Sequence, residues 1–183
     1  AWRMGDTEEE AAAVFEEGRA LAERKGDQQA RAMFIGRYGL IRASIAGSVS
    51  EYVRYGEEAA RIAENIDDSS LVAAIRTWPA YAHFLVGNGN ASLAWSERVL
   101  ATVGADNHLG KHFFGYSPRV SMHHVRASAS TFLGRLDESW TRFDDAARIA
   151  VEAGDLEVDG WIQYSRMMLA HACGVGDSIG DHG

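Results

Sequence analysis

The stretch FLGRLDESW, residues 132–140, places a glycine between two segments with the composition of amphipathic helices. It can be interpreted as a loop that presents Arg135, Asp137 and Glu138 to a ligand, or as the turn between two helices. A turn in a repeat array has to recur along the chain, whereas a ligand-binding loop need not. The rest of the sequence therefore decides between the two interpretations.

Stretches of the same kind recur at nearly constant spacing. The glycines of AGSVSE, VGNGNAS, LGRLDES and CGVGDS stand at positions 47, 87, 134 and 174, with gaps of 40, 47 and 40 residues. The glycine of MGDTEEE, at position 5, precedes the first of these by 42 residues. The tetrapeptide ARIA occurs at 60–63 and again at 147–150, and this separation of 87 residues is also that between Gly47 and Gly134. Self-similarity with a period near 40 is typical of helical-repeat arrays, so FLGRLDESW is predicted to be a turn.

The segments between the glycines have the periodicity of amphipathic helices. In residues 136–153, Leu136, Trp140 and Phe143 are three or four residues apart, and acidic residues occupy the opposite face. No segment shows the sustained alternation of apolar and polar residues that is typical of strands. The sequence predicts helices over residues 7–25, 28–45, 49–65, 69–85, 90–103, 117–133, 136–153 and 156–173.

The fold class predicted from this pattern is all-α. Residues 1–183 are expected to form one α-solenoid domain of about four antiparallel helix pairs, stacked into a right-handed superhelical array. Local signals mark the helix ends. Gly134 stands where a left-handed C-cap favours glycine, Asp27 and Asp155 are predicted N-caps, and Ser117 caps a helix that begins with Pro118.

Composition restricts the partners and the compartment. The net charge of −8 argues against a general nucleic-acid or acidic-membrane surface, because both are bound through basic patches. No apolar run approaches the roughly 20 residues that span a bilayer. The single cysteine, Cys173, cannot form an internal disulfide, which favours a cytoplasmic location, and we expect it to be a buried small hydrophobe. The chain starts without methionine, so we expect residues 1–183 to be a fragment of a longer protein.

No group of residues has the pattern of a catalytic, metal or cofactor site. His108 and His112 are four residues apart, but Gly110 disfavours the helix that would place both on one face. Gly87 and Gly89 follow a predicted helix rather than a strand, and the sequence contains no Walker-type phosphate loop. We therefore predict no catalytic residue, no metal site and no cofactor.

Residues 104–118 are the irregular part of the repeat, because they account for the longest gap between the repeated glycines. Insertions in repeat arrays form loops and often lie on a functional face. Phe113, Phe114 and Tyr116 of this insertion are predicted either to pack against neighbouring helices or to contact a ligand or partner.

The two-helix units of about 40 residues, with the phrases LGRLDES and ARIA followed by AGD, resemble the tetratricopeptide-like superfamily. HLGKHFFGYSP and the later FLGRLDESWTRFDDAARIAVEAGD are similar to repeats of multidomain bacterial adenylate/guanylate cyclases. In those proteins a class III cyclase domain and an AAA-type ATPase module precede the helical array. ATPase-linked transcriptional activators carry similar arrays. The likeness covers nearly the whole chain, although the roughly 34-residue tetratricopeptide signature is not met.

This resemblance implies a non-catalytic domain for protein–protein interaction or regulation within a bacterial signalling protein. Its expected partners are a protein segment or other domains of the parent chain. The alternative is a small-molecule effector-sensing array of an ATPase-linked transcriptional activator. No cyclase or ATPase motif is present in residues 1–183, so cyclase activity is an expectation for the parent chain alone.

In tetratricopeptide-like arrays the first helix of each pair lines the concave side. Here these are the helices that end at the repeated glycines, and positions 11, 8 and 4 residues before each glycine share one helical face. That face is polar or small throughout, and its candidate binding residues are Arg76, His83, His123, Arg126, Gln163 and Arg166. It is expected to be either a solvated face or a groove that meets an acidic segment or an anionic ligand.

Overall fold

The computed structural model describes residues 7–175, and the regular secondary structure within that range is entirely helical. The helices are α1 (Glu8–Lys25), α2 (Gln28–Ala46), α3 (Val49–Ala63), α4 (Ser69–Leu85), α5 (Gly89–Val103), α6 (Lys111–Phe114), α7 (Pro118–Phe132), α8 (Leu136–Ala153) and α9 (Leu156–Ala172). The all-α prediction is confirmed for these residues.

The eight predicted helices are all present, and their ends differ from the prediction by at most two residues. The short helix α6 was not predicted, and it lies inside the insertion 104–118. The repeat mark at Gly5 falls outside the described residues.

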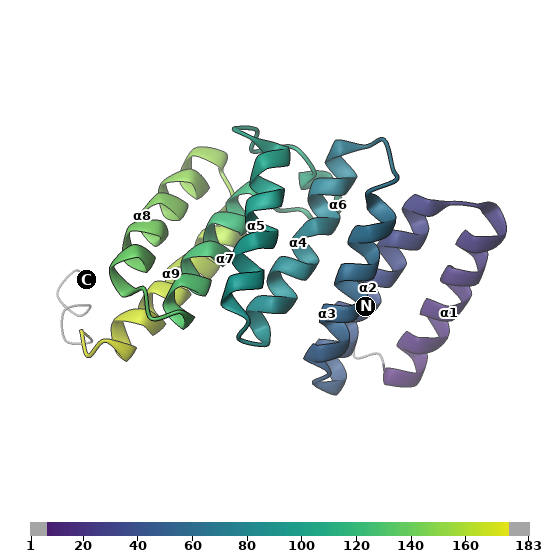
Figure 1. Ribbon diagram of the computed structural model, residues 1–183, viewed down its shortest axis with the longest axis horizontal. Coiled ribbons are helices and arrows are strands. Elements are labelled where there is room, and N and C mark those ends of the chain that lie inside the picture. The colour runs from purple at the N-terminus through teal and green to yellow at the C-terminus, as the bar shows by residue number, and fades with distance from the viewer. Residues whose placement is uncertain (1–6, 176–183) are drawn as a thin grey trace.

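Consecutive helices form hairpins that lie side by side along the long axis of the molecule (Figure 1). α2 packs on α3, α4 on α5 and α7 on α8, and in each hairpin a short turn joins two antiparallel helices. α2, α4, α7 and α9 also contact one another in that order, and we call these four the inner helices. α3, α5 and α8 each pack between two successive inner helices, whereas α1 packs on α2.

The turn that contains Gly134 has the predicted conformation. α7 ends at Phe132, and Gly134 has φ 71°, a left-handed value that glycine adopts without steric cost. The amide of the next residue, Arg135, donates to the Ser130 carbonyl at 3.0 Å and closes the turn that reverses the chain. The predicted aspartate cap is present as well, since the Asp27 side chain accepts from the Ala30 amide at 2.9 Å.

The core is divided into three clusters that follow one another along the chain. The first joins α1 to α4, the second joins α4, α5 and α7, and the third joins α7 to α9. Their largest fully buried side chains are Tyr52, Ile35, Leu71 and Ile75 in the first cluster, Met122, Val99 and Val125 in the second, and Phe143, Ile162, Val120 and Val158 in the third. Each hairpin therefore buries its apolar face against its neighbours rather than against a common centre.

Glycines allow the closest approaches between helices. The indole of Trp78 in α4 lies directly on the backbone of Gly36 in α2, where a Cβ atom would overlap the ring. On the next helix, a Cβ at Gly56 would lie 3.1 Å from the backbone nitrogen of Pro79. α4 continues through this proline, because Pro79 is an internal residue of the helix.

The expectation that Cys173 is buried was wrong. The thiol is free and exposed, because Cys173 is the C-cap of α9 and lies beyond the turns of that helix that pack on α8. In the part of the chain that the structure describes, no helix has both the length and the apolar character needed to span a bilayer.

Substitution of Gly36 by alanine should lower the free energy of unfolding by about 1–3 kcal/mol, because the Trp78 ring has to move away from the new methyl group. Chemical denaturation of the purified variant measures this change. Gly160→Ala is the matched control, since Gly160 of α9 is exposed and no atom of a neighbouring element lies within 4 Å of the corresponding Cβ, and it should stabilise by about 0.5–1 kcal/mol. Equal effects of the two substitutions would contradict the packing described here.

Candidate functional site

A groove of about 910 Å³ lies between the inner helices. α2, α4, α7 and α9 contribute to its walls, together with the first turn of α3 and the end of the insertion. Most of its large side chains are aromatic, namely Tyr52, Trp78, Tyr81, Phe84, Phe114, Tyr116, Trp161 and Tyr164. This groove is the candidate functional site.

A chain of ring contacts runs along the groove from α4 to α9. The ring centroids are 5.2 Å apart between Trp78 and Phe114, 5.7 Å between Phe114 and Tyr116, and 5.1 Å between Tyr116 and Trp161. The last pair is nearly perpendicular, at 71°, and aromatic rings favour this edge-to-face arrangement. The insertion therefore supplies the two rings that connect α4 to α9.

The structure divides the three aromatic residues that the sequence singled out in the insertion. Phe114 and Tyr116 line the groove. Phe113 packs instead against the first core cluster and the ring of His112, whose centroid is 4.0 Å away. All three thus have a packing role, and two of them also form the wall of the candidate site.

Hydrogen bonds hold the insertion in place at both of its ends. Near its start, Arg119 donates to the Gly104 carbonyl at 3.0 Å and to the Asn107 side chain at 2.6 Å. Further along, the Gly110 amide donates to the Ser70 hydroxyl at 3.0 Å, which joins the insertion to the first turn of α4.

The end of the insertion is joined to α9 through one buried carboxylate. Asp155 is the N-cap of α9, as predicted, and its Oδ1 accepts from the Val158 amide at 3.4 Å. Its Oδ2 accepts from the amide of Ser117 at 2.6 Å. Ser117 is itself the N-cap of α7, since its hydroxyl accepts from the Val120 amide at 3.4 Å. The position of the Tyr116 ring is thereby tied to the start of α9.

His124 is the buried histidine of the groove wall. Its Nε2 lies 2.9 Å from the hydroxyl of Ser165 and 3.4 Å from that of Ser128. Its Nδ1 is buried without a hydrogen-bond partner among the described residues. Burial lowers the pKa of His124 to about 4, so the ring is neutral at neutral pH.

The half-buried phenols of Tyr81 and Tyr116 in the groove are also neutral at neutral pH. Burial, more than any neighbouring charge, raises the pKa of Tyr116 to about 12, and burial also raises the pKa of Tyr81. A neutral phenol both donates and accepts a hydrogen bond. The groove thus presents apolar rings together with hydroxyl groups, which suits a ligand that is mainly apolar and has a few polar groups.

None of the six residues predicted to form a binding face lines this groove. They belong to α4, α7 and α9, which contribute other residues to the groove, and the binding face itself stays a prediction. The residues ten positions before the repeated glycines line the groove in all four inner helices, and they are Arg37, Thr77, His124 and Tyr164. The predicted residues stand eleven, eight or four positions before the same glycines, and one residue turns an α-helix by about 100°.

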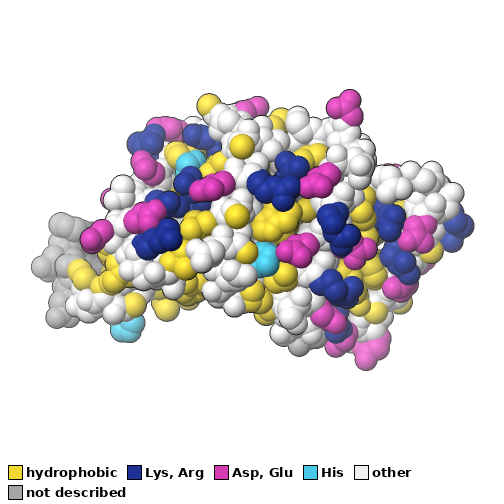
Figure 2. All heavy atoms as spheres, in the orientation of Figure 1, with side chains coloured by type: hydrophobic (Ala, Val, Ile, Leu, Met, Phe, Trp, Pro, Cys, Tyr) yellow, Lys and Arg dark blue, Asp and Glu magenta, His cyan; other side chains and the backbone are white. Residues whose placement is uncertain are grey.

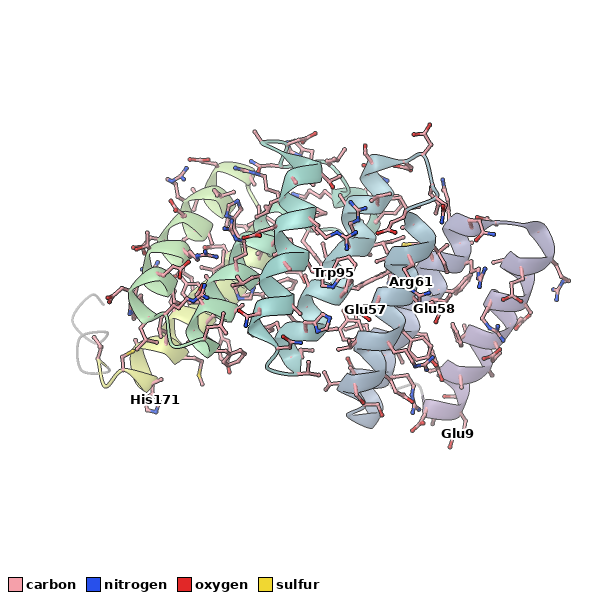
Figure 3. The ribbon with its side chains drawn as sticks, in the orientation of Figure 1. Glu9, Glu57, Glu58, Arg61, Trp95 and His171 are labelled. Atoms are coloured by element: carbon pink, nitrogen blue, oxygen red, sulfur yellow. The ribbon has the colours of Figure 1, made fainter. Side chains whose placement is uncertain are left out.

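Two of the predicted residues, both from α4, point to the seam with α3. Arg76 lies 4.0 Å from the carboxylate of Glu64 and donates to the Thr102 hydroxyl of α5 at 3.2 Å. Nε2 of His83 lies 3.0 Å from Glu57 Oε1. Glu57 belongs to α3 and is labelled in Figure 3.

Arginines of the later inner helices, at a different repeat position from Arg76, form similar pairs. Arg126 of α7 lies 3.9 Å from Glu97 of α5, and Arg166 of α9 lies 2.9 Å from Asp144 of α8. In each case the carboxylate belongs to the hairpin that precedes the inner helix. Basic and acidic side chains are interspersed on the face formed by α3, α5 and α8 (Figure 2). These predicted residues therefore pair across the seams between units.

The remaining two predicted residues also lie outside the groove. His123 is partly buried, and its pKa is lowered to about 4, first by burial and then by the nearby arginines Arg119 and Arg126. Gln163 donates to Asp159 within α9 at 3.0 Å. Within residues 7–175 the structure contains no cluster of three or more His, Cys, Asp or Glu side chains that could hold a metal ion.

Buried His124 predicts a pH dependence of stability. Its folded pKa of about 4 lies below the ordinary value of 6.5, so its stabilising contribution is complete above pH 6.5. The contribution is lost as the pH falls from 6.5 towards 4, because the unfolded chain takes up the proton first. The loss attributable to this side chain should be about 3 kcal/mol.

Urea denaturation across this pH range should therefore show that His124→Gln loses less stability on acidification than the wild type. His108→Gln is the matched control, because His108 is exposed in the folded chain, and it should retain the wild-type dependence. A profile for His124→Gln that is parallel to the wild type would contradict the assignment.

Comparison with known proteins adds no relative from which a function could be inferred. Neither a protein-family model nor a curated protein sequence matches this chain.

Proposed function

We propose that this chain is a non-catalytic helical-repeat domain that binds a polypeptide segment in the aromatic groove. The supporting observation is that structurally equivalent positions of four inner helices, ten residues before each repeated glycine, all face the same groove. A surface built in this way grows with the number of units, which is how repeat arrays form extended binding surfaces.

The aromatic character of the lining favours a polypeptide partner. Tyrosine and tryptophan provide large apolar contact areas with few rotatable bonds, and they dominate the energetics of protein interfaces. Tyr164 is 62% exposed and Trp161 is partly exposed, so these rings offer apolar area that a bound chain would cover. Phe114 and Tyr116 also line the groove and are held by packing and by the hydrogen bonds of the insertion.

The order of the inner helices and the spacing of the glycines support the tetratricopeptide-like class and a right-handed superhelical stack. The resemblance to arrays of ATPase-linked signalling proteins supports a regulatory role within a bacterial protein, in the cytoplasm. In that role the partner is another protein or another domain of the parent chain. The net charge of −8 disfavours nucleic acid and acidic membranes as partners.

A small-molecule effector is the second candidate ligand. The groove volume of about 910 Å³ lies within the range of roughly 300–1,000 Å³ typical of small-molecule sites. Buried His124 and the neutral phenols of Tyr81 and Tyr116 would then supply the polar contacts.

A selection from a phage-displayed library of random heptapeptides tests the first proposal. The wild-type chain should enrich peptides with large apolar side chains, and Tyr164→Ala should weaken their binding about 5- to 100-fold, because it removes an exposed ring from the groove. Met168→Ala is the matched control, since Met168 is 49% exposed on the same helix but does not line the groove. Fluorescence anisotropy of the enriched peptides measures the dissociation constants.

The outcomes separate the candidates. A library that yields no enrichment overturns peptide binding, and a shift of the melting temperature by a metabolite, abolished in Tyr164→Ala, would then support the effector instead. Binding that is weakened by Arg126→Ala but not by Tyr164→Ala would place the site on the seam between α5 and α7.

A further inference from the structure

The groove has one charged side chain from the first inner helix and one from the last. Among the described residues, Arg37 and Glu157 are the only charged side chains that line it. Arg37 belongs to α2 and Glu157 to α9, which are the first and the last inner helices. Charges of opposite sign therefore stand at the two ends of a lining that is otherwise apolar or uncharged.

The Arg37 guanidinium is oriented but not neutralised by the protein. One of its nitrogens donates to the Phe113 carbonyl at 3.2 Å, and the group lies 5.9 Å from the centroid of the Phe114 ring. A guanidinium has five N–H donors in a planar fork that matches a carboxylate. In the described range, no carboxylate forms an ion pair with Arg37, in contrast to Arg76, Arg126 and Arg166, which do not line the groove.

Glu157 is likewise exposed and unpaired within residues 7–175. It stands four residues before Trp161 and seven before Tyr164, so the three side chains share one face of α9. Faces of tryptophan and tyrosine rings attract cations, and a neighbouring carboxylate strengthens that attraction. This end of the groove has the composition of a site for a basic side chain.

Both charges act on the centre of the groove. The pKa of Tyr116, which burial raises, is raised further by Glu157 and lowered by Arg37. Arg37, Tyr116 and Glu157 thus line the same groove, and the two charges have opposite effects on the Tyr116 phenol.

We infer that the groove selects a dipolar polypeptide segment, in which an acidic residue pairs with Arg37, a basic residue lies at Glu157 against Trp161 and Tyr164, and apolar or aromatic side chains occupy the space between them. The inference rests on the proposed function and adds the charge pattern of the partner. A segment with two acidic ends would place a carboxylate beside Glu157, and one with two basic ends would place a cation beside Arg37. Like charges in contact disfavour both alternatives.

The test compares heptapeptide pools selected from one phage library by the wild type, by Arg37→Glu and by Glu157→Lys. The wild-type pool should be enriched in peptides that contain one acidic and one basic residue. The Arg37→Glu pool should exchange the acidic residue for a second basic one, and the Glu157→Lys pool should exchange the basic residue for a second acidic one. Arg61→Glu and Glu58→Lys are the matched controls, because both residues lie on α3 outside the groove lining (Figure 3), and their pools should match the wild-type pool.

A rescue experiment excludes misfolding as the cause. The most enriched wild-type peptide should bind each single variant about three- to tenfold more weakly. The double variant Arg37→Glu, Glu157→Arg should recover the affinity for the same peptide with its acidic and basic residues exchanged. No enrichment by the wild type overturns the proposed function and this inference with it. Enrichment without a charge pattern, or a pattern that both single variants retain, overturns the inference and leaves peptide binding intact.

Discussion

The contact between the Trp78 indole and the Gly36 backbone sets the spacing of α2 and α4, and the groove depends on that spacing. Because Gly36 has no side chain, the indole lies directly on α2. The same ring then contacts Phe114 at 5.2 Å and supports the wall that the insertion forms. One glycine thus determines both the packing of the first units and the position of the aromatic lining.

Two kinds of contact join successive units, and they lie on different faces of the inner helices. On one face, ion pairs such as Arg166 with Asp144 connect an inner helix to the preceding hairpin. These pairs are solvent-accessible, so each contributes little to stability. On another face, rings from non-adjacent helices meet through the insertion. The charges of the ion pairs have partners within the chain. The face with the aromatic rings has exposed apolar area and, in the described structure, two charges without an ion-pair partner, Arg37 and Glu157.

The sequence was sufficient to predict the helices, since glycine spacing, capping residues and 3.6-residue periodicity are local signals. It also singled out the four inner helices, and Phe114 and Tyr116 of the insertion, all of which contribute to the groove. The sequence did not show which face of these helices lines the groove, because local patterns do not reveal that Arg76 and Arg126 lie beside carboxylates of neighbouring elements. An aromatic lining gathered from α4, α9 and the insertion depends on tertiary contacts such as that of Tyr116 with Trp161. Aromatic residues three positions apart, on α9 (Trp161 and Tyr164) and on α4 (Trp78, Tyr81 and Phe84), were the signal that could have indicated it.

The Asp155 carboxylate connects the end of the insertion to the start of α9 by hydrogen bonds. Its two carboxylate oxygens accept from the amides of Ser117 and Val158, so a single buried side chain holds the end of the insertion, the start of α7 and the first turn of α9. A shift of the backbone at Tyr116 therefore requires either that the first turn of α9 moves with it or that the hydrogen bond between Ser117 and Asp155 breaks.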